Sequence, residues 1–168
     1  MAFYSSSRAE NAIYFVMKPS PTLLLLCFAA AGLALPALAA DGPGPAPTDV
    51  VLIGHDKVSQ TFERGGALLL TDKYKVLAGL RVAPGAVEVH AVDTDVFYIV
   101  DGSATFVTGG TAVEPKEIGP NEIHAKSITG GTERHLAKGD VIIIPHGIPH
   151  QFTQVDGRFL YFVVKVPQ

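Results

Sequence analysis

The sequence predicts an all-β domain, a sandwich or a barrel, over residues 49–168. Short runs rich in β-branched and aromatic residues follow one another through this region, and Gly, Pro, Asp and Asn separate them at regular intervals. No sustained helical stripe appears between these runs. With 168 residues, of which 48% are hydrophobic, the chain can fill one core but is short for two domains.

Residues 1–39 are predicted to form a signal peptide. An apolar stretch begins at Leu23, Lys18 supplies a positive flank, and Ala37-Leu38-Ala39 places small residues where a signal peptidase cuts. We expect cleavage after Ala39 or after Ala40. A membrane anchor is the alternative, but a proline interrupts the stretch, and its about seventeen residues fall short of the ~20 that a spanning helix needs.

A leader of residues 40–48 is predicted to separate the signal peptide from the β domain. Met17 directly precedes Lys18, so residues 1–16 either belong to the protein or reflect a misplaced start, with Met17 as the true one. Residues 40–48 form a Pro/Gly-rich leader, and residues 49–168 form the β domain. We expect a periplasmic or secreted protein with no membrane segment after cleavage.

Composition narrows the classes of partner and of metal ligand. The net charge of −3 and the scattered basic residues give no site for nucleic acid, so a small molecule or another protein is the expected partner. The only cysteine, Cys27, lies in the signal peptide, so the mature chain has no thiolate. Any metal must therefore be bound by His, Asp and Glu.

The expected strands follow in chain order. They cover residues 50–53, 67–70, 74–82, 86–91, 96–100, 104–107, 140–144, 150–154 and 158–166. The breaks at Asp101-Gly102 and Asp156-Gly157 are predicted to be turns between separate strands. The more polar stretch 112–128, bracketed by two Thr-Gly-Gly-Thr sequences, is predicted to be a long loop or a hairpin excursion.

Two polar clusters point to chemistry inside the fold. Glu88 and His90 alternate with two valines, so both side chains face the same side of a hydrophobic strand. Asp95 opens the next strand, and Pro145 to Pro149 frame a bend that delivers His150 at the start of another. Buried polar groups of this kind need a partner. Two imidazoles and two carboxylates suit one Fe, Mn, Zn, Ni or Cu ion.

The second segment resembles the second motif of the cupin superfamily, G-x5-P-x-G-x2-H-x3-N. It matches through Gly139, Pro145, Gly147 and His150, with Gln154 in place of the closing Asn.

The first segment resembles the first cupin motif, G-x5-H-x-H-x4-E-x6-G, more loosely. His90 holds the second His position and Gly102 the final Gly. Glu88 replaces the first His, Asp95 replaces the Glu, and Gly85 lies closer to the ligands than the motif's opening Gly.

This resemblance implies a single cupin-type β-barrel, a double-stranded β-helix or jelly roll, with one divalent metal held by Glu88, His90, Asp95 and His150. It implies a metal-dependent oxidoreductase, dioxygenase-like, acting on a small molecule. The alternative is a non-catalytic periplasmic binding or sensor protein, in which the same side chains form a hydrogen-bonded network without metal. Pairing of outer strands through residues 162–166 would give a homodimer.

The remaining polar and aromatic residues take ordinary roles in this interpretation. Phe97, Ile99 and Phe152 share the parity of the ligand strands and are expected to line the pocket. Tyr98 is expected to pack inside the barrel, and Arg81 to be a surface charge. His124 and His135 are predicted to lie on the surface or to cap the barrel mouth.

Overall fold

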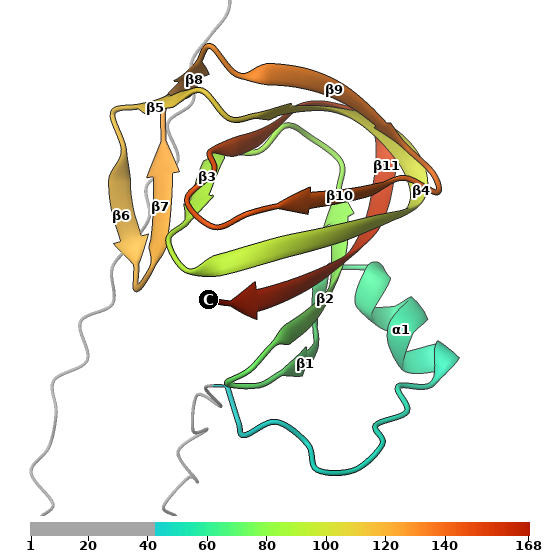
Figure 1. Ribbon diagram of the computed structural model, residues 1–168. Helices are drawn as coiled ribbons and strands as arrows, with labels where there is room; N and C mark the ends of the chain where they lie inside the picture. The colour runs from blue at the N-terminus through green and yellow to red at the C-terminus, as the bar shows by residue number, and fades with distance from the viewer. Residues whose placement is uncertain (1–42) are drawn as a thin grey trace, which may run out of the picture. The chain divides into compact units, whose positions relative to one another are not determined.

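Long strands that fold back on one another build the domain (Figure 1). The computed structural model describes residues 43–168, so the predicted signal peptide and residues 40–42 of the leader lie outside the described residues. The described part contains one helix, α1 (His55–Phe62), and these strands: β1 (Gly66–Leu70), β2 (Lys75–Arg81), β3 (Val87–His90), β4 (Asp93–Thr108), β5 (Thr111–Val113), β6 (Lys116–Gly119), β7 (Glu122–Ala125), β8 (Ser127–Thr129), β9 (Thr132–Ala137), β10 (Val141–Ile144) and β11 (His150–Pro167).

Nine of these strands form one antiparallel sheet. Its path runs β1-β2-β11-β3-β7-β6, and β4 joins it by pairing with β11 as well as with β9 and β10. Strands β5 and β8 form a separate two-stranded sheet. Because β4 and β11 each bend and pair with several neighbours, the sheet rolls up around an interior, as Figure 1 shows. The all-β prediction is confirmed.

Two predicted turns are bends within continuous strands. Strand β4 passes through Gly102 and β11 passes through Gly157, so four expected strands are two strands of 16 and 18 residues. The pairing between β4 and β11 shifts register at these bends. Gly102 has a φ of 79°, and a Cβ there would collide with the carbonyl oxygen of Arg158. The glycines therefore bend the strands without ending them.

The polar stretch 112–128 contains a hairpin, which is one of the two alternatives predicted from the sequence. Strands β6 and β7 form this hairpin, and β7 pairs along its length with β3, the strand that carries Glu88 and His90. The flanking β5 and β8 pair with each other at the base of the excursion. Strand β9, which follows, was not expected from the sequence and pairs with the second half of β4.

The segment before the sheet differs from the prediction. Residues 50–53 form no strand, and Val50 and Leu52 are 91% and 90% exposed, because no strand pairs with them. Residues 55–62 form the helix α1, which the sequence did not predict because eight residues are too few for a sustained stripe. The ring of Phe62 packs edge-on against Phe162 of β11, with centroids 4.9 Å apart. That contact holds α1 on the outer surface of the sheet.

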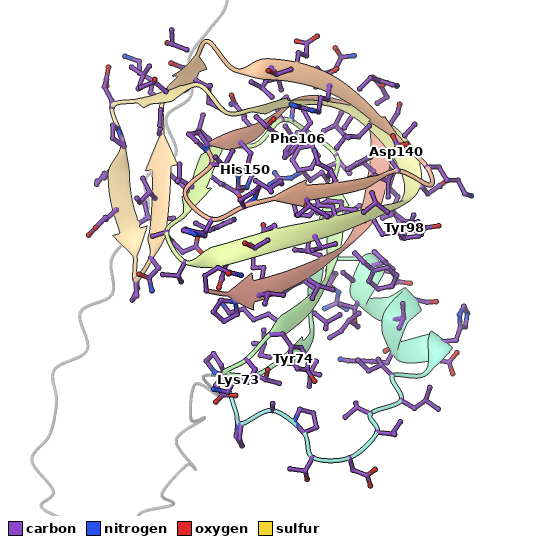
Figure 2. The ribbon with its side chains drawn as sticks, in the orientation of Figure 1. Lys73, Tyr74, Tyr98, Phe106, Asp140 and His150 are labelled. Carbon is purple, nitrogen blue, oxygen red and sulfur yellow. The ribbon has the colours of Figure 1, made fainter. Side chains whose placement is uncertain are left out.

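Aromatic rings fill the interior of the rolled sheet. Phe97, Ile99 and Phe152 are buried in one cluster, on the inward face that their parity predicts, together with Phe106 and Tyr161. Figure 2 shows Phe106 and His150 inside the fold, whereas Tyr98 projects from it. The expectation that Tyr98 packs inside is wrong, since it is 49% exposed. It alternates with the inward-facing residues on either side of it in β4.

The leader pairs with the segment between β1 and β2. In the leader, Gly44 bridges to Thr71, and the carbonyl oxygen of Gly44 accepts a 2.7 Å hydrogen bond from the backbone N–H of Asp72. Among residues 43–168, no helix has the length and apolar character needed to cross a membrane.

Candidate metal centre

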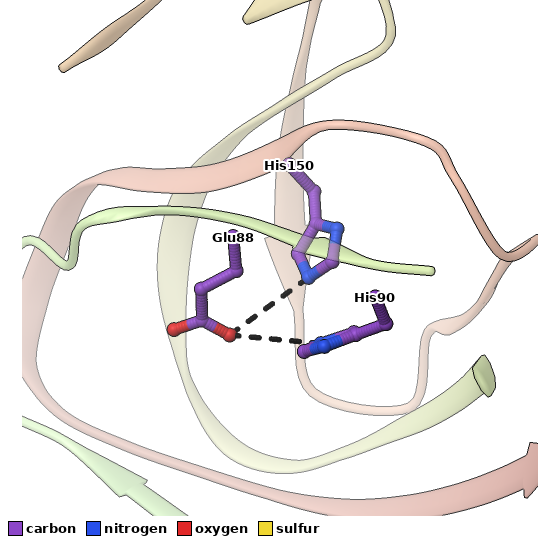
Figure 3. A group of neighbouring side chains, drawn as sticks. All are labelled: Glu88, His90 and His150. Carbon is purple, nitrogen blue, oxygen red and sulfur yellow. Dashed lines mark ion pairs between the residues drawn. The ribbon is translucent and has the colours of Figure 1, made fainter. Parts of the chain in front are cut away.

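Three of the four predicted ligands meet at one point. Glu88 and His90 lie on the same face of β3, and His150, the first residue of β11, pairs directly opposite Glu88. One nitrogen or oxygen atom from each of the three lies within 4.8 Å of the others (Figure 3). Both histidines are buried, at 6% and 3% exposed. The strand pairing therefore builds a cluster of two imidazoles and one carboxylate.

The bend between β10 and β11 brings His150 to this cluster. Gly147 takes a φ of 75°, and its backbone N–H donates a 2.8 Å hydrogen bond to the carbonyl oxygen of His90. Pro145 ends the hydrogen-bonded part of β10, and its carbonyl oxygen accepts a bond from the N–H of Ile148. The loop of the second motif is thus fixed directly to the strand of the first.

Each histidine turns the same ring nitrogen away from the cluster. Nδ1 of His150 lies 3.0 Å from the carbonyl oxygen of Ile148, and Nδ1 of His90 lies 2.6 Å from Oε2 of Glu122. Both partners are acceptors, so each Nδ1 carries a proton, and in the neutral form of each ring Nε2 keeps its lone pair.

The two Nε2 atoms have no hydrogen-bond partner. They are the buried side-chain atoms left unpaired among residues 43–168. Oε2 of Glu88 lies 3.8 Å from Nε2 of His90 and 3.9 Å from Nε2 of His150. Buried polar atoms without partners are rare and costly, and three electron-pair donors that converge on one point fit a cation between them.

Asp95 lies beside the cluster and has a partner of its own. Its Oδ2 is 3.3 Å from Nε2 of His90, and both of its oxygens accept hydrogen bonds from Nζ of Lys165, at 2.9 and 2.8 Å. Burial acts to raise the pKa of Asp95, but His90 and Lys165 outweigh it, so the pKa is lowered. Asp95 is therefore a charged carboxylate, and it is not a member of the group of three.

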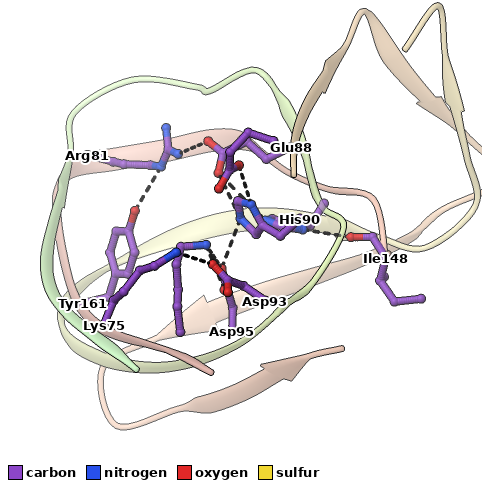
Figure 4. Close-up of polar contacts among 11 residues, drawn as sticks. Lys75, Arg81, Glu88, His90, Asp93, Asp95, Ile148 and Tyr161 are labelled. Atoms are coloured by element: carbon purple, nitrogen blue, oxygen red, sulfur yellow. Dashed lines mark hydrogen bonds and ion pairs between the residues drawn. The ribbon is translucent and has the colours of Figure 1, made fainter. Parts of the chain in front are cut away.

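Arg81 holds the remaining oxygen of Glu88. Nη2 of Arg81 donates a 2.9 Å hydrogen bond to Oε1 of Glu88, and its Nε donates to Oη of Tyr161 at 3.3 Å (Figure 4). The guanidinium also stacks over the ring of Phe152, 4.7 Å from its centroid. A Cβ at Gly85 would collide with this guanidinium, so only glycine leaves it in place. Arg81 is not the surface charge that we expected.

The surroundings act in opposite directions on the two histidines. Burial acts to lower the pKa of His90, but the close carboxylates of Asp95 and Glu122 raise it overall, against the charge of Lys165. Burial lowers the pKa of His150, and the neighbouring His90 adds to this effect. His150 is thus held neutral, the form that binds a metal.

Sequence reasoning missed the residues that surround the cluster. Glu122 lies in the polar excursion, and Lys165, Arg81 and Tyr161 lie on strands whose neighbours were unknown. The alternation in β7 places Glu122 and His124 on the face shared with Glu88 and His90, which the sequence could have shown only with the β3–β7 pairing known. His135, on β9, is exposed, as expected.

Comparisons with known proteins identify the fold. No family model and no curated protein sequence matches the chain. A solved structure from Bacillus halodurans is similar with a TM-score of 0.52 and 11% identity, over 74% of this chain and 86% of that one. An uncharacterized conserved protein with a double-stranded β-helix domain from Klebsiella pneumoniae has a TM-score of 0.50 and 16% identity, over 71% and 91%.

A third structure is longer than this chain. The DMSP lyase DddQ from Ruegeria pomeroyi has a TM-score of 0.43 and 19% identity over 62% of this chain, which spans 46% of the length of that protein. The Klebsiella pneumoniae structure, which is similar over most of both chains, shows that this chain has the double-stranded β-helix fold that the resemblance to the cupin motifs implies.

Proposed function

We propose that this cupin-fold domain binds one divalent transition-metal ion through Nε2 of His90, Nε2 of His150 and Oε2 of Glu88, and that it is a metal-dependent oxidoreductase acting on a small molecule. The observation that carries the proposal is the pair of buried Nε2 atoms, unpaired and both within 4 Å of one carboxylate oxygen. Hydrogen bonds on the opposite side of each ring favour the tautomer that a metal requires.

The ligand set fits the range Fe, Mn, Zn, Ni or Cu, since two histidines and one carboxylate hold zinc as well as iron, and the proposed oxidoreductase function selects a redox-active ion such as iron. Two histidines and one carboxylate form the donor set of non-haem iron(II) oxygenases, in which the remaining coordination positions stay open. Iron(II) held in this way supplies the redox chemistry that binds and activates dioxygen. The protein's part is to hold three donors and to leave the other positions free.

The neighbouring residues have distinct tasks in this proposal. Arg81 fixes the carboxylate of Glu88, so that one oxygen is turned toward the histidines. Phe106 packs against His150 at a centroid distance of 5.8 Å, and its aromatic neighbours exclude water from the inner side. Glu88 is the most exposed of the three ligands, with 29% of its side chain accessible, so a small molecule would approach from its side.

Asp95 is assigned to the surroundings of the ligands in this proposal. Nζ of Lys165 donates a hydrogen bond to each oxygen of Asp95, so both oxygens already have a partner without a metal. A fourth protein ligand would also occupy a position that a substrate or dioxygen needs.

A second candidate function is a metal-free binding or sensor protein. The observation that favours it is the number of carboxylates around His90, namely those of Glu88, Asp95 and Glu122. These three groups would also stabilise a protonated imidazole, so the cation at this point would be a proton. The network would then orient a small ligand without catalysis.

Metal analysis of the purified, untagged protein distinguishes the two functions. After anaerobic reconstitution with Fe²⁺, and separately with Mn²⁺, Ni²⁺, Cu²⁺ or Zn²⁺, the proposal expects one ion per chain, lost in His150→Ala and kept in His135→Ala. His135 is an exposed control on β9. At a metal concentration 100 times the Kd, the ion should stabilise the domain by about 2.7 kcal/mol, an effect that a chelator reverses. If the wild-type protein takes up no ion, the metal-binding proposal is wrong and the metal-free binding function is the one that the site supports.

Export and self-association remain proposals that rest on the sequence. The predicted signal peptide, residues 1–39, supports a periplasmic or secreted location. For the homodimer, Phe162 packs against α1, whereas Val166 is 36% exposed, so part of the predicted surface is already covered. Light scattering on the mature chain tests the homodimer, and a monomer at all concentrations would contradict it.

A further inference from the structure

A residue from outside both motifs contacts the ring of His90. Glu122 is the first residue of β7 and pairs directly across from His90 in the β3–β7 ladder. Directly opposed residues of an antiparallel pair have side chains on the same face. The carboxylate therefore meets the ring edge that faces away from Glu88, and Oε2 lies 2.6 Å from Nδ1.

The backbone of the hairpin places this carboxylate. The hairpin turn contains Asn121, which has a φ of 63° and whose carbonyl oxygen accepts a 2.9 Å hydrogen bond from the backbone N–H of Ala91. Four consecutive residue pairs join β3 to β7, from Val87 opposite Ala125 to His90 opposite Glu122. The position of Glu122 thus follows from main-chain pairing, which is more rigid than a free surface side chain.

We propose that Glu122 is a positioning residue of the metal centre, an inference that rests on the proposed function. By accepting a hydrogen bond from Nδ1–H of His90, Glu122 fixes the tautomer that presents the Nε2 lone pair and increases the basicity of Nε2. His150 obtains the same tautomer from a backbone carbonyl, which no side-chain substitution removes. His90 depends on a side chain, so the hairpin completes a centre whose ligands all lie elsewhere.

The hairpin supplies a matched control. Glu117 lies on β6 opposite Ile123 of β7. Ile123 alternates with Glu122 and His124, so it lies on the other face of the hairpin. The side chain of Glu117 therefore points to that face as well and is exposed. Glu117→Gln changes the charge of the hairpin by the same amount as Glu122→Gln, without touching His90.

The first measurement is metal affinity, by competition of Zn²⁺ or Ni²⁺ with a chromophoric chelator. Glu122→Ala should weaken binding 10- to 100-fold, which is the usual effect of losing such a partner. Glu122→Gln keeps the shape of the side chain but loses its charge, and should weaken binding by about 10-fold. Glu117→Gln should bind as the wild type does. Equal affinity in all four proteins would overturn the inference.

The second measurement needs no metal. Long-range ¹H–¹⁵N spectra of the metal-free protein at alkaline pH report which ring nitrogen of His90 carries the proton. The wild type and Glu117→Gln should show one Nδ1–H tautomer, and Glu122→Ala, which has no acceptor at this point, should show a mixture or the Nε2–H form. If the wild type binds no metal, the proposed function fails, and these spectra still decide the role of Glu122. A His90 ring that keeps the Nδ1–H tautomer in Glu122→Ala would rule that role out.

Discussion

Arg81 and Glu88 are joined so that the two oxygens of the carboxylate have different tasks. Oε1 accepts a 2.9 Å hydrogen bond from Nη2 of Arg81, and Oε2 faces the unpaired nitrogens of His90 and His150. Both side chains are largely buried, at 22% and 29% exposed, so solvent screens this pair less than an exposed one. The pair explains how a glutamate at this position can act as a ligand with a defined direction.

Arg81→Met should weaken metal binding without unfolding the domain. Methionine keeps the apolar cover over Phe152 but leaves Oε1 of Glu88 free to rotate, so the affinity should fall by about 10-fold. Arg64→Met is the control, since Arg64 is exposed. The measurement is the chelator competition, and an unchanged Kd would show that Glu88 needs no such support.

Asp95→Asn tests whether Asp95 is a fourth ligand. Loss of the carboxylate leaves Lys165 buried without its counter-charge, which should destabilise the domain by on the order of 3 kcal/mol in urea unfolding. Metal affinity should fall less than in His90→Ala. Asp93→Asn breaks a similar pair with Lys75 and is the control for stability alone. A loss as large as that of His90→Ala would make Asp95 a ligand, as the sequence predicts.

Phe106→Ala should affect both stability and the metal centre. The side chain is fully buried, so its loss should cost about 3–5 kcal/mol. Because its ring lies 5.8 Å from that of His150, the cavity would also free that ligand and lower metal affinity. Phe159→Ala removes an equally buried ring that packs on Phe152 and Tyr161. Calorimetry should show similar destabilisation for both variants, and equal metal affinities would contradict the role given to Phe106.

Gly102→Ala should destabilise the domain more than Gly157→Ala. Both glycines have positive φ values, of 79° and 72°, so each change costs about 1–2 kcal/mol of backbone strain. At Gly102 the new methyl group also collides with the carbonyl of Arg158, whereas nothing lies within 4 Å at Gly157. The difference between the two unfolding free energies measures the collision. Equal values would mean that β11 moves away at no cost.

The sequence predicted what depends on alternation and motif spacing. Glu88, His90 and the inward position of Phe97 follow from the period of two, and His150 follows from the Pro-Gly bend. The neighbours Glu122, Arg81 and Lys165 depend on which strands pair and in which register, and no local pattern encodes that. The breaks at Gly102 and Gly157 were misjudged for a related reason, because a glycine with positive φ serves a turn and a bulge equally well.

For the helix α1 and the segment before it, local sequence predicted the wrong secondary structure. Residues 50–53 have strong β-propensity but no partner strand, and a strand without a partner leaves its backbone unpaired. Residues 55–62 are too few for a sustained helical stripe, and they are placed by contacts with the sheet, among them the ring contact of Phe62 with Phe162 and a hydrogen bond that Arg158 donates to the carbonyl oxygen of Phe62. Tertiary contacts decided both outcomes.

The contacts that assemble the centre join distant parts of the chain. Arg81 and Tyr161 are 80 residues apart, and Asp95 and Lys165 are 70 apart. Folds dominated by such pairings fold slowly, because long loops must close before the contacts form. We expect an ion that needs β3, β7 and β11 together to bind after the transition state, which unchanged refolding rates with and without metal would check. It would therefore slow unfolding while leaving the refolding rate unchanged, so the bound ion would set the lifetime of the folded domain.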